Sequence, residues 1–242
     1  MNSLVLRSKF LILTALTLLV SIGAVAQGTS RTAPGVSATM IRLFGDIPGF
    51  TAKAEVQLLD NTQKEVLRMP LDFSMLDKKI RVDVDMSKMK SDDLSPQNLE
   101  WFKERGMINV VSIIAPDKIY VYYPSRKAML CTVSSPEAIA AAAKSAKLTQ
   151  TELGKETIEG HPCIKKRAML TDEQSRPIEA ITWNATDLKG FPVQIQIRDK
   201  ESTSFVRFKQ VQLTKPEAKQ FEPPAGFTQF TNEDQLVEAL MK

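Results

Sequence analysis

Residues 67–86, LRMPLDFSMLDKKIRVDVDM, carry an apolar side chain at every second position over two successive segments. The odd-numbered positions are apolar in residues 67–75, and the even-numbered positions are apolar in residues 80–86. Such alternation is the pattern of a β-strand with one buried side and one side facing solvent. The preceding residues 51–59, TAKAEVQLL, alternate in the same way. These three segments therefore predict an antiparallel meander.

The rest of the chain predicts further strands and a few short helices. Alternating or apolar runs recur from residue 109 to residue 213, which brings the predicted total to ten or eleven strands. Three helices are predicted where a capping residue precedes a proline or an apolar face, at Ser95, Ser135 and Asn232. Since the connections are mostly of hairpin length, we predict an α+β, β-rich fold.

Two of the strands are predicted to be irregular. Pro70 cannot donate a hydrogen bond to a neighbouring strand, which favours a bulge or a sheet edge at that position. The apolar positions change parity between Phe208 and Val211. A bulge near Lys209 and Gln210 would produce that change.

The N-terminal 26 residues have the pattern of a secretory signal peptide. Arg7 and Lys9 precede an uncharged run from Phe10 to Ala26, which ends in an Ala-Val-Ala cleavage signal. We expect cleavage after Ala26, then a flexible leader over residues 27–44 and a single domain over residues 45–242. An uncleaved membrane anchor is the alternative, since the uncharged run is 17 residues long. No cysteine follows the cleavage site, so we expect a periplasmic protein without a lipid anchor.

The charge of the chain excludes nucleic acid as an expected partner. The formal net charge is +4, and removal of the signal peptide takes away two basic and no acidic side chains, which leaves +2. A nucleic-acid-binding domain carries a much stronger basic field.

We also expect the protein to be a monomer and to bind no cofactor.

Cys131 and Cys163 are the two cysteines of the chain. Because the periplasm is oxidising, we predict a disulfide between them. A bridge over this separation would stabilise the fold by ~3–4 kcal/mol in the chain-entropy description. The alternative is two separate buried thiols that behave as small apolar side chains.

His161, in the stretch KETIEGHPCIKKR at residues 155–167, is the single histidine of the chain. A two-residue Gly160-His161 turn of type II′ between two strands explains the stretch, because glycine adopts the positive φ that this turn requires. A zinc site of His161, both cysteines and a carboxylate is one alternative. A nucleophilic Cys163 activated by His161 is another. We expect neither a metal site nor catalytic residues.

Apolar side chains on the strands and on the first predicted helix form the candidate ligand site. Methionine is flexible and polarisable, so a wall rich in methionine adapts to ligands of varied shape. A long antiparallel sheet curls, and helices that do not fill its hollow leave an apolar cavity. The alternative is that the same side chains form only the core. The candidate cavity residues are Met69, Leu71, Phe73, Met75, Val82, Val84, Trp101 and Phe102.

Several motifs between Gly45 and Phe227 resemble one known family. They are IYVYYPSRKAMLCTV at 119–133, KETIEGHPCIKKRAMLTDE at 155–173, ITWNATDLKGFPVQIQI at 181–197 and FEPPAGF at 221–227. In order and spacing they resemble the LolA/LolB-like superfamily of periplasmic proteins. The nearest likeness is a poorly characterised branch related to outer-membrane lipoprotein-sorting proteins.

The resemblance implies an open half-barrel of about eleven antiparallel strands wrapped around short helices. It also implies a carrier that holds acyl chains of lipids or lipoproteins between the sheet and the helices, without catalysing a reaction. The alternative function is an envelope module, with the same fold and a filled core, that binds or senses another protein. An enzyme is the third hypothesis.

Overall fold

The computed structural model describes residues 41–92, 94–137, 139–140, 148–171, 177–198 and 202–241. The strands are β1 (Gly49–Asp60), β2 (Glu65–Leu76), β3 (Lys79–Asp85), β4 (Lys90–Ser91), β5 (Asn109–Ile114), β6 (Lys118–Tyr123), β7 (Ala128–Val133), β8 (Leu148–Ile158), β9 (His161–Thr171), β10 (Pro177–Ala185), β11 (Phe191–Arg198), β12 (Ser202–Gln212) and β13 (Thr228–Phe230). The helices are α3 (Pro96–Glu104) and α5 (Glu233–Met241), with short 3-10 turns η1 (Met86–Lys88), η2 (Pro124–Arg126), η3 (Thr186–Leu188) and η4 (Ala218–Phe221).

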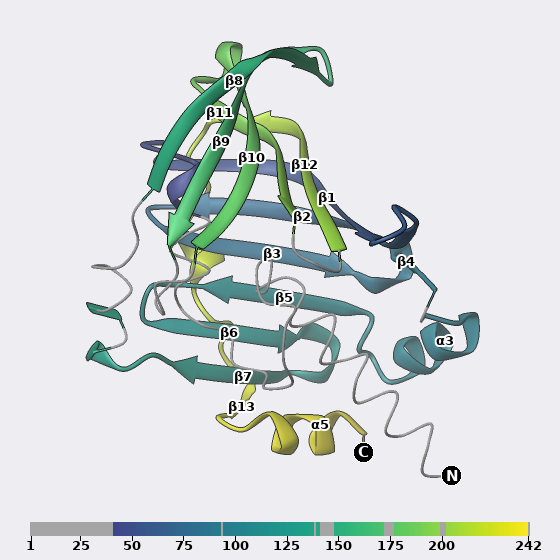
Figure 1. The fold of residues 1–242 in the computed structure, drawn as a ribbon. Helices are drawn as coiled ribbons and strands as arrows, with labels where there is room; N and C mark the ends of the chain where they lie inside the picture. Colours follow the sequence, from purple (N-terminus) through teal and green to yellow (C-terminus); the bar gives the residue numbers. More distant parts are fainter. Residues whose placement is uncertain are drawn as a thin grey trace.

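All thirteen strands of the described chain belong to one curved sheet (Figure 1). Twelve of them follow the order β13-β7-β6-β5-β3-β2-β1-β12-β11-β10-β9-β8, and β4 pairs with β2 beside this path. Neighbouring strands are antiparallel, except that β13 runs parallel to β7. The terminal strands β13 and β8 do not pair with each other, so the sheet stays open. The predicted open antiparallel half-barrel with short helices is confirmed.

The meander predicted from residues 51–86 is present as β1, β2 and β3. In this register Ala54 lies opposite Leu71, and Leu71 lies opposite Val84. The alternating apolar side chains therefore line up on one side of the sheet, which we call the inner face. The opposite side, the outer face, carries the polar set of the same strands.

Helix caps confirm two of the three predicted helix starts. The Ser95 side chain accepts a hydrogen bond from Asn98 N at 3.1 Å, and α3 begins at Pro96. The Asn232 side chain accepts one from Asp234 N at 2.7 Å, directly before α5. The helix predicted after Ser135 falls largely outside the described residues, as do the predicted signal peptide and most of the predicted leader.

The end of the predicted leader is part of the folded domain. Residues 41–43 form a helical turn, and the side chains of Leu43 and Phe44 are buried. Residues 41–44, which the prediction assigned to the leader, therefore pack with the domain. The reason is apolar burial, since Leu43 and Phe44 belong to the main hydrophobic cluster.

The bulge predicted near Lys209 and Gln210 is confirmed, and of the two alternatives predicted at Pro70, a bulge or a sheet edge, the structure shows a local edge. The register between β1 and β12 shifts between Thr51 and Lys53, and Gln210 has a φ of 51°. Pro70, by contrast, pairs regularly with Glu55 of β1. On its other side β2 changes partner, from β3 at Leu71 to β4 at Arg68. Pro70 lies in the gap between these two partners, where no donor is needed.

The segment after β12 crosses the outer face of the sheet. Lys215 Nζ lies 3.2 Å from Asp77 Oδ1, and Arg81 Nη1 donates to the Gln220 carbonyl oxygen at 2.8 Å. The Phe227 ring then packs edge-on against Tyr122, with 5.6 Å between centroids. We call residues 213–227 the strap. It joins β12, near the middle of the sheet, to the β13–β7 end.

Candidate functional site

Seven of the eight predicted cavity residues belong to one hydrophobic cluster, and the eighth, Trp101, packs against it. Six lie on the inner face, because the β2 set Met69, Leu71, Phe73 and Met75 faces the same side as the β3 set Val82 and Val84. Phe73 lies opposite Val82, and Leu71 lies opposite Val84. The exposed fraction of these six side chains is between 1 and 6 %. The sequence therefore identified a continuous apolar surface, which in this structure is covered.

The two predicted helical residues lie at the margin of this surface. Phe102 on α3 is buried and belongs to the cluster. Trp101 is half-buried and packs against it. The Trp101 ring meets the Phe102 ring edge-on at 5.2 Å, and the Arg105 guanidinium lies 4.3 Å from the Trp101 ring centroid. Trp101 thus has a cation on one side and the core on the other.

The centre of the inner face holds an aromatic cluster that the sequence did not reveal. The Phe44 ring lies 4.9 Å from Phe50, 5.8 Å from Phe73, 5.5 Å from Phe191 and 5.7 Å from Phe208, between centroids. These rings come from β1, β2, β11 and β12. The apolar side chains Ile41, Leu43 and Phe44, close together before the first strand, were the signal that could have placed Phe44 there. Phe44 thus packs against Phe73, one of the predicted cavity residues.

The predicted disulfide is absent, because Cys131 and Cys163 are both buried free thiols. Cys131 lies on β7 and Cys163 on β9, and eight strands separate β7 from β9 in the sheet order. Cys163 Sγ donates to the His161 carbonyl oxygen at 3.3 Å. Burial raises the pKa of the Cys163 thiol, and the negative charges of Asp187 and Glu156 raise it further. The site therefore holds the thiol, which is a poor nucleophile.

His161 lies at a hairpin between β8 and β9, as predicted, but one position later in the turn than expected. Glu159 and Gly160 have φ values of 52° and 86°, the two positive angles of a type I′ turn. His161 is the first residue of β9 and pairs with Ile158. The predicted Gly160-His161 turn is therefore corrected to Glu159-Gly160. His161 Nδ1 lies 2.7 Å from Asp187 Oδ2, in an exposed pair beside η3.

The described part of the chain contains neither a cluster of metal ligands nor a membrane-spanning helix. No group of three or more His, Cys, Asp and Glu side chains there is placed to hold a metal ion. No helix there is long and apolar enough to cross a membrane.

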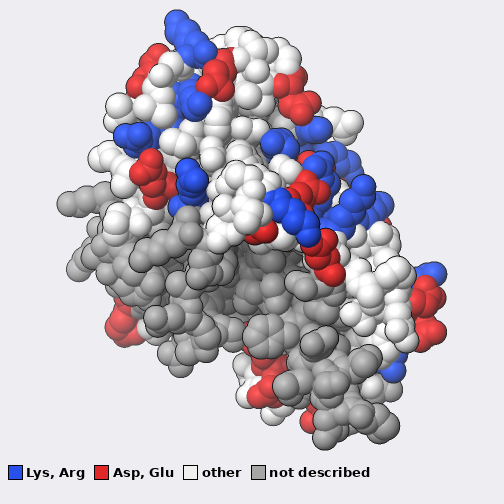
Figure 2. Space-filling model, turned by 45° about the vertical axis from the view of Figure 1, so that its right-hand side comes forward, with Lys and Arg blue, Asp and Glu red and all other residues white. Residues whose placement is uncertain are grey.

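Positive and negative side chains are mixed over the upper part of the molecule, where β8 to β12 lie (Figure 2).

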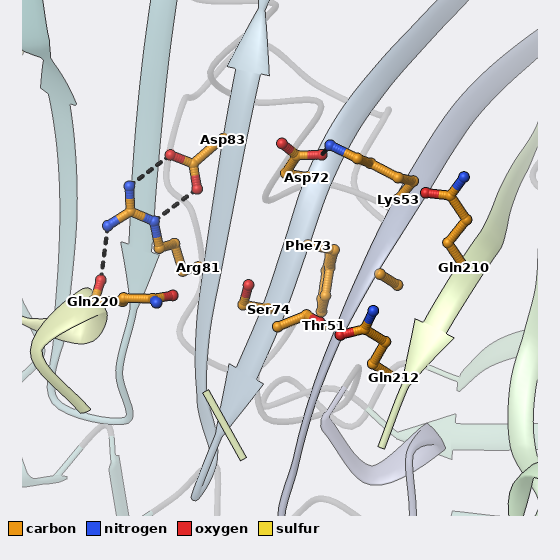
Figure 3. Close-up of a pocket in the computed structure, with 11 residues that line it drawn as sticks. Thr51, Lys53, Asp72, Phe73, Ser74, Arg81, Asp83, Gln210, Gln212 and Gln220 are labelled. Carbon is orange, nitrogen blue, oxygen red and sulfur yellow. Dashed lines mark hydrogen bonds and ion pairs between the residues drawn. The ribbon is translucent and has the colours of Figure 1, made fainter. Parts of the chain in front are cut away.

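A cavity lies on the outer face, and no sequence pattern predicted it. We call it the outer groove (Figure 3). Its volume is about 470 Å³, and it is bordered by β12, β1, β2, β3 and the η4 turn of the strap. Two ion pairs lie in its wall: Lys53 Nζ to Asp72 Oδ1 at 2.6 Å, and Arg81 to Asp83 through two hydrogen bonds of 2.7 and 2.6 Å. The remaining side chains that face it are neutral and polar.

Comparison with known proteins gives matches among solved structures. No protein-family model matches the chain, and no curated protein matches it. An uncharacterized conserved protein from Thermus thermophilus is similar, with 8 % identity over 81 % of this chain and 98 % of that one, at a TM-score of 0.47.

Two further matches carry descriptive names. A LolA superfamily protein from Nitrosomonas europaea shares 12 % identity over 79 % of this chain and 97 % of that one, at a TM-score of 0.34. A putative outer membrane lipoprotein-sorting protein domain from Vibrio parahaemolyticus shares 10 % identity over 78 % of this chain and 94 % of that one, also at 0.34. Among the solved structures to which this chain is similar are thus LolA superfamily proteins, the family that its sequence resembles.

Proposed function

We propose that the inner face of the sheet binds the acyl chain of a lipid or of an acylated lipoprotein, and that the protein carries this ligand through the periplasm without catalysing a reaction. The observation that carries the proposal is the continuity of the apolar surface. Side chains from β1, β2, β3, β11 and β12 join in one cluster, with methionine and phenylalanine among the most buried. The resemblance of the sequence to the LolA/LolB-like superfamily supports the same class of ligand.

The energetics of such a surface suit a carrier. Transfer of an alkyl chain from water contributes about 0.8 kcal/mol for each buried CH₂ group, so a long chain gains affinity without directional contacts. Met69 and Met75 can rearrange around chains of different shape. Because β8 and β13 do not pair, the sheet leaves a route to the inner face that a closed barrel would not have.

Methionine methyl groups provide a direct test, because they lie on both faces of the sheet. Met69 and Met75 are on the inner face, whereas Met129 belongs to a separate outer-face cluster under Phe227. We expect oleic acid and lysophospholipid, titrated below micelle formation, to shift the ¹³C-methyl signals of Met69 and Met75 and to leave Met129 unchanged. Met69→Leu, Met75→Leu and Met129→Leu would assign the signals, since this exchange nearly conserves volume.

Two outcomes of this titration would contradict the proposal. If no inner methionine responds, or if Met129 responds equally, the inner face is not the ligand site. Mass spectrometry of the protein extracted from its own cells under native conditions gives an independent measurement. We expect a co-purified lipid mass there.

A second candidate function is the envelope protein-interaction or sensor module. The burial of Met69, Phe73 and Val82, together with the position of Phe44 against Phe73, supports it, because a filled inner face has no room for a ligand without rearrangement. On this hypothesis the inner methionine signals stay unchanged with lipid. A defined envelope protein then binds the exterior of the sheet and is recovered with the protein by affinity capture after cross-linking.

A further inference from the structure

The outer groove is a cavity formed by the crossing of the strap over the sheet. The strap passes close over Gly49, where a Cβ atom would lie 3.2 Å from Lys215 Cα. Further along, the Arg81 guanidinium binds the Gln220 carbonyl oxygen and so fixes η4 above β3 (Figure 3). The bulge at Gln210, with its φ of 51°, bends β12 beside β1. Bulges of this kind often redirect side chains at binding sites.

The charges around the groove cancel in pairs. Lys53 pairs with Asp72, and Arg81 is held by both carboxylate oxygens of Asp83. Two cations and two anions leave no net charge to attract an ion. An anionic ligand would meet Asp72 and Asp83, and a cationic ligand would meet Lys53 and Arg81. The groove therefore favours a neutral ligand.

The groove also lacks apolar side chains that could hold a hydrophobic ligand. Phe73 and Ala52 border it, but both side chains are buried in the inner-face cluster. The Phe73 ring stacks on the Phe50 ring at 5.6 Å, on the far side of the sheet. What remains is a set of side-chain amides and hydroxyls, from Thr51, Ser74, Gln210, Gln212 and Gln220.

These five side chains are free to bind a ligand. None of them forms a side-chain hydrogen bond with another residue of the described chain, and Figure 3 shows them around the groove with only the Gln220 backbone engaged. A primary amide offers two donors and two acceptor lone pairs, and a hydroxyl offers both functions. The matching ligand is dense in groups that both donate and accept hydrogen bonds.

Saccharide hydroxyls match this set better than a peptide does. An extended peptide gains most of its affinity by adding a strand to a free sheet edge. The strands β1, β2 and β3 under the groove are paired on both sides. β12 has an unpaired edge only beyond Arg207, where its pairing with β11 ends, and a peptide added there would lie beside the sheet and not over the groove on its outer face. The volume of about 470 Å³ lies within the range of small-ligand sites. We propose that the outer groove binds a neutral saccharide, independently of the inner face.

Protein-observed NMR with maltose and N,N′-diacetylchitobiose tests this proposal. We expect both the side-chain amide signals of Gln210, Gln212 and Gln220 and the backbone signals of the neighbouring strands to shift in a saturable way. The double variant Gln212→Ala/Gln220→Ala should bind at least tenfold more weakly. Gln210 is left intact, because a substitution at a residue with positive φ would also change the energy of the backbone conformation. Gln229→Ala, at an exposed glutamine on β13, is the matched control and should bind as the wild type does.

Three results would overturn the proposal. They are the absence of saturable shifts with either sugar, equal binding by the double variant, and stronger groove binding by a capped neutral pentapeptide, which would indicate a peptide site. Circular dichroism and the melting temperature of each variant verify the fold. Since the methionine signals report the inner face and the glutamine signals the outer groove, failure of one proposal is distinguishable from failure of the other.

Discussion

Phe44 illustrates how one side chain organises the inner face. It precedes the first strand, and its ring touches rings from four strands, of which β11 and β12 lie far away in the sequence. Aromatic pairs at these separations add stability beyond the area they bury. Because Phe44 covers Phe73, it also competes for the surface that we assign to a ligand.

Phe44→Ala should destabilise the protein by about 3–5 kcal/mol, because it removes a buried ring and leaves a cavity. Urea unfolding followed by circular dichroism measures this difference. Phe205→Ala, at a half-buried outer-face ring of β12, is the control and should cost clearly less. A loss for Phe44→Ala that does not exceed the control would show that the five-ring cluster does not support the core.

Glu65 gives a pH-dependent contribution to stability. Hydrogen bonds from Arg68 and then Gln57 lower the pKa of Glu65 from 4.5 to about 2. A carboxyl with a depressed folded-state pKa stabilises the fold above its unfolded pKa, and this contribution is lost as the pH falls through the folded pKa. Its side chain is 31 % exposed, so solvent weakens the effect.

The melting temperature of Glu65→Gln should therefore lie below that of the wild type at pH 6. The two values should converge as the pH is lowered from about 4.5 to about 2. Glu152→Gln, at an exposed position of β8, is the control and should follow the wild type throughout. A wild-type advantage that stays constant over this range would contradict the assigned pKa.

At the level of elements, the turn of the β8–β9 hairpin contains a residue that is poorly suited to its backbone conformation. Glu159 has a φ of 52°, which an ordinary side chain adopts at a cost of roughly 1 kcal/mol. Asn-Gly is the preferred pair for this turn type. The ion pair of Glu159 with Lys209, at 3.4 Å between exposed side chains, contributes little.

Glu159→Asn should therefore stabilise the protein by about 0.5–1 kcal/mol, which a chemical denaturation curve resolves. Glu159→Ala removes the same ion pair but keeps a side chain poorly suited to positive φ, so it should bring no gain. Equal stability of Asn and Ala at this position would show that the turn is not strained.

Local patterns predicted the elements, whereas distant pairings could not be predicted. The alternation around Met69 and Val82 and the caps at Ser95 and Asn232 depend on neighbouring residues, so the sequence displays them directly. The short strands β4 and β13 span two and three residues, which is too few to show alternation. The separation of Cys131 from Cys163 depends on the order of the strands in the sheet. The outer groove depends on the path of the strap, for which no periodicity exists.

At the level of the whole molecule, two features hold an open sheet together. The main apolar cluster extends from Leu130 on β7 to Cys163 on β9 along the inner face. The strap crosses the outer face and is fixed at Asp77, Arg81 and Tyr122. The sheet thus carries a candidate site on each face, and the same strap that creates the groove covers the apolar outer side of β5 to β7.

The pairing of β1 with β12 also sets the order in which the protein can fold. Val56 lies opposite Val206, 150 positions later, so the middle of the sheet forms only when the last third of the chain is present. During synthesis, which proceeds from the N-terminus, the edge of β1 that pairs with β12 stays unpaired until β12 has been made. Long-range pairing of this kind is slow and leaves intermediates prone to aggregate. We therefore expect the β1 edge to be prone to aggregation until β12 has been made.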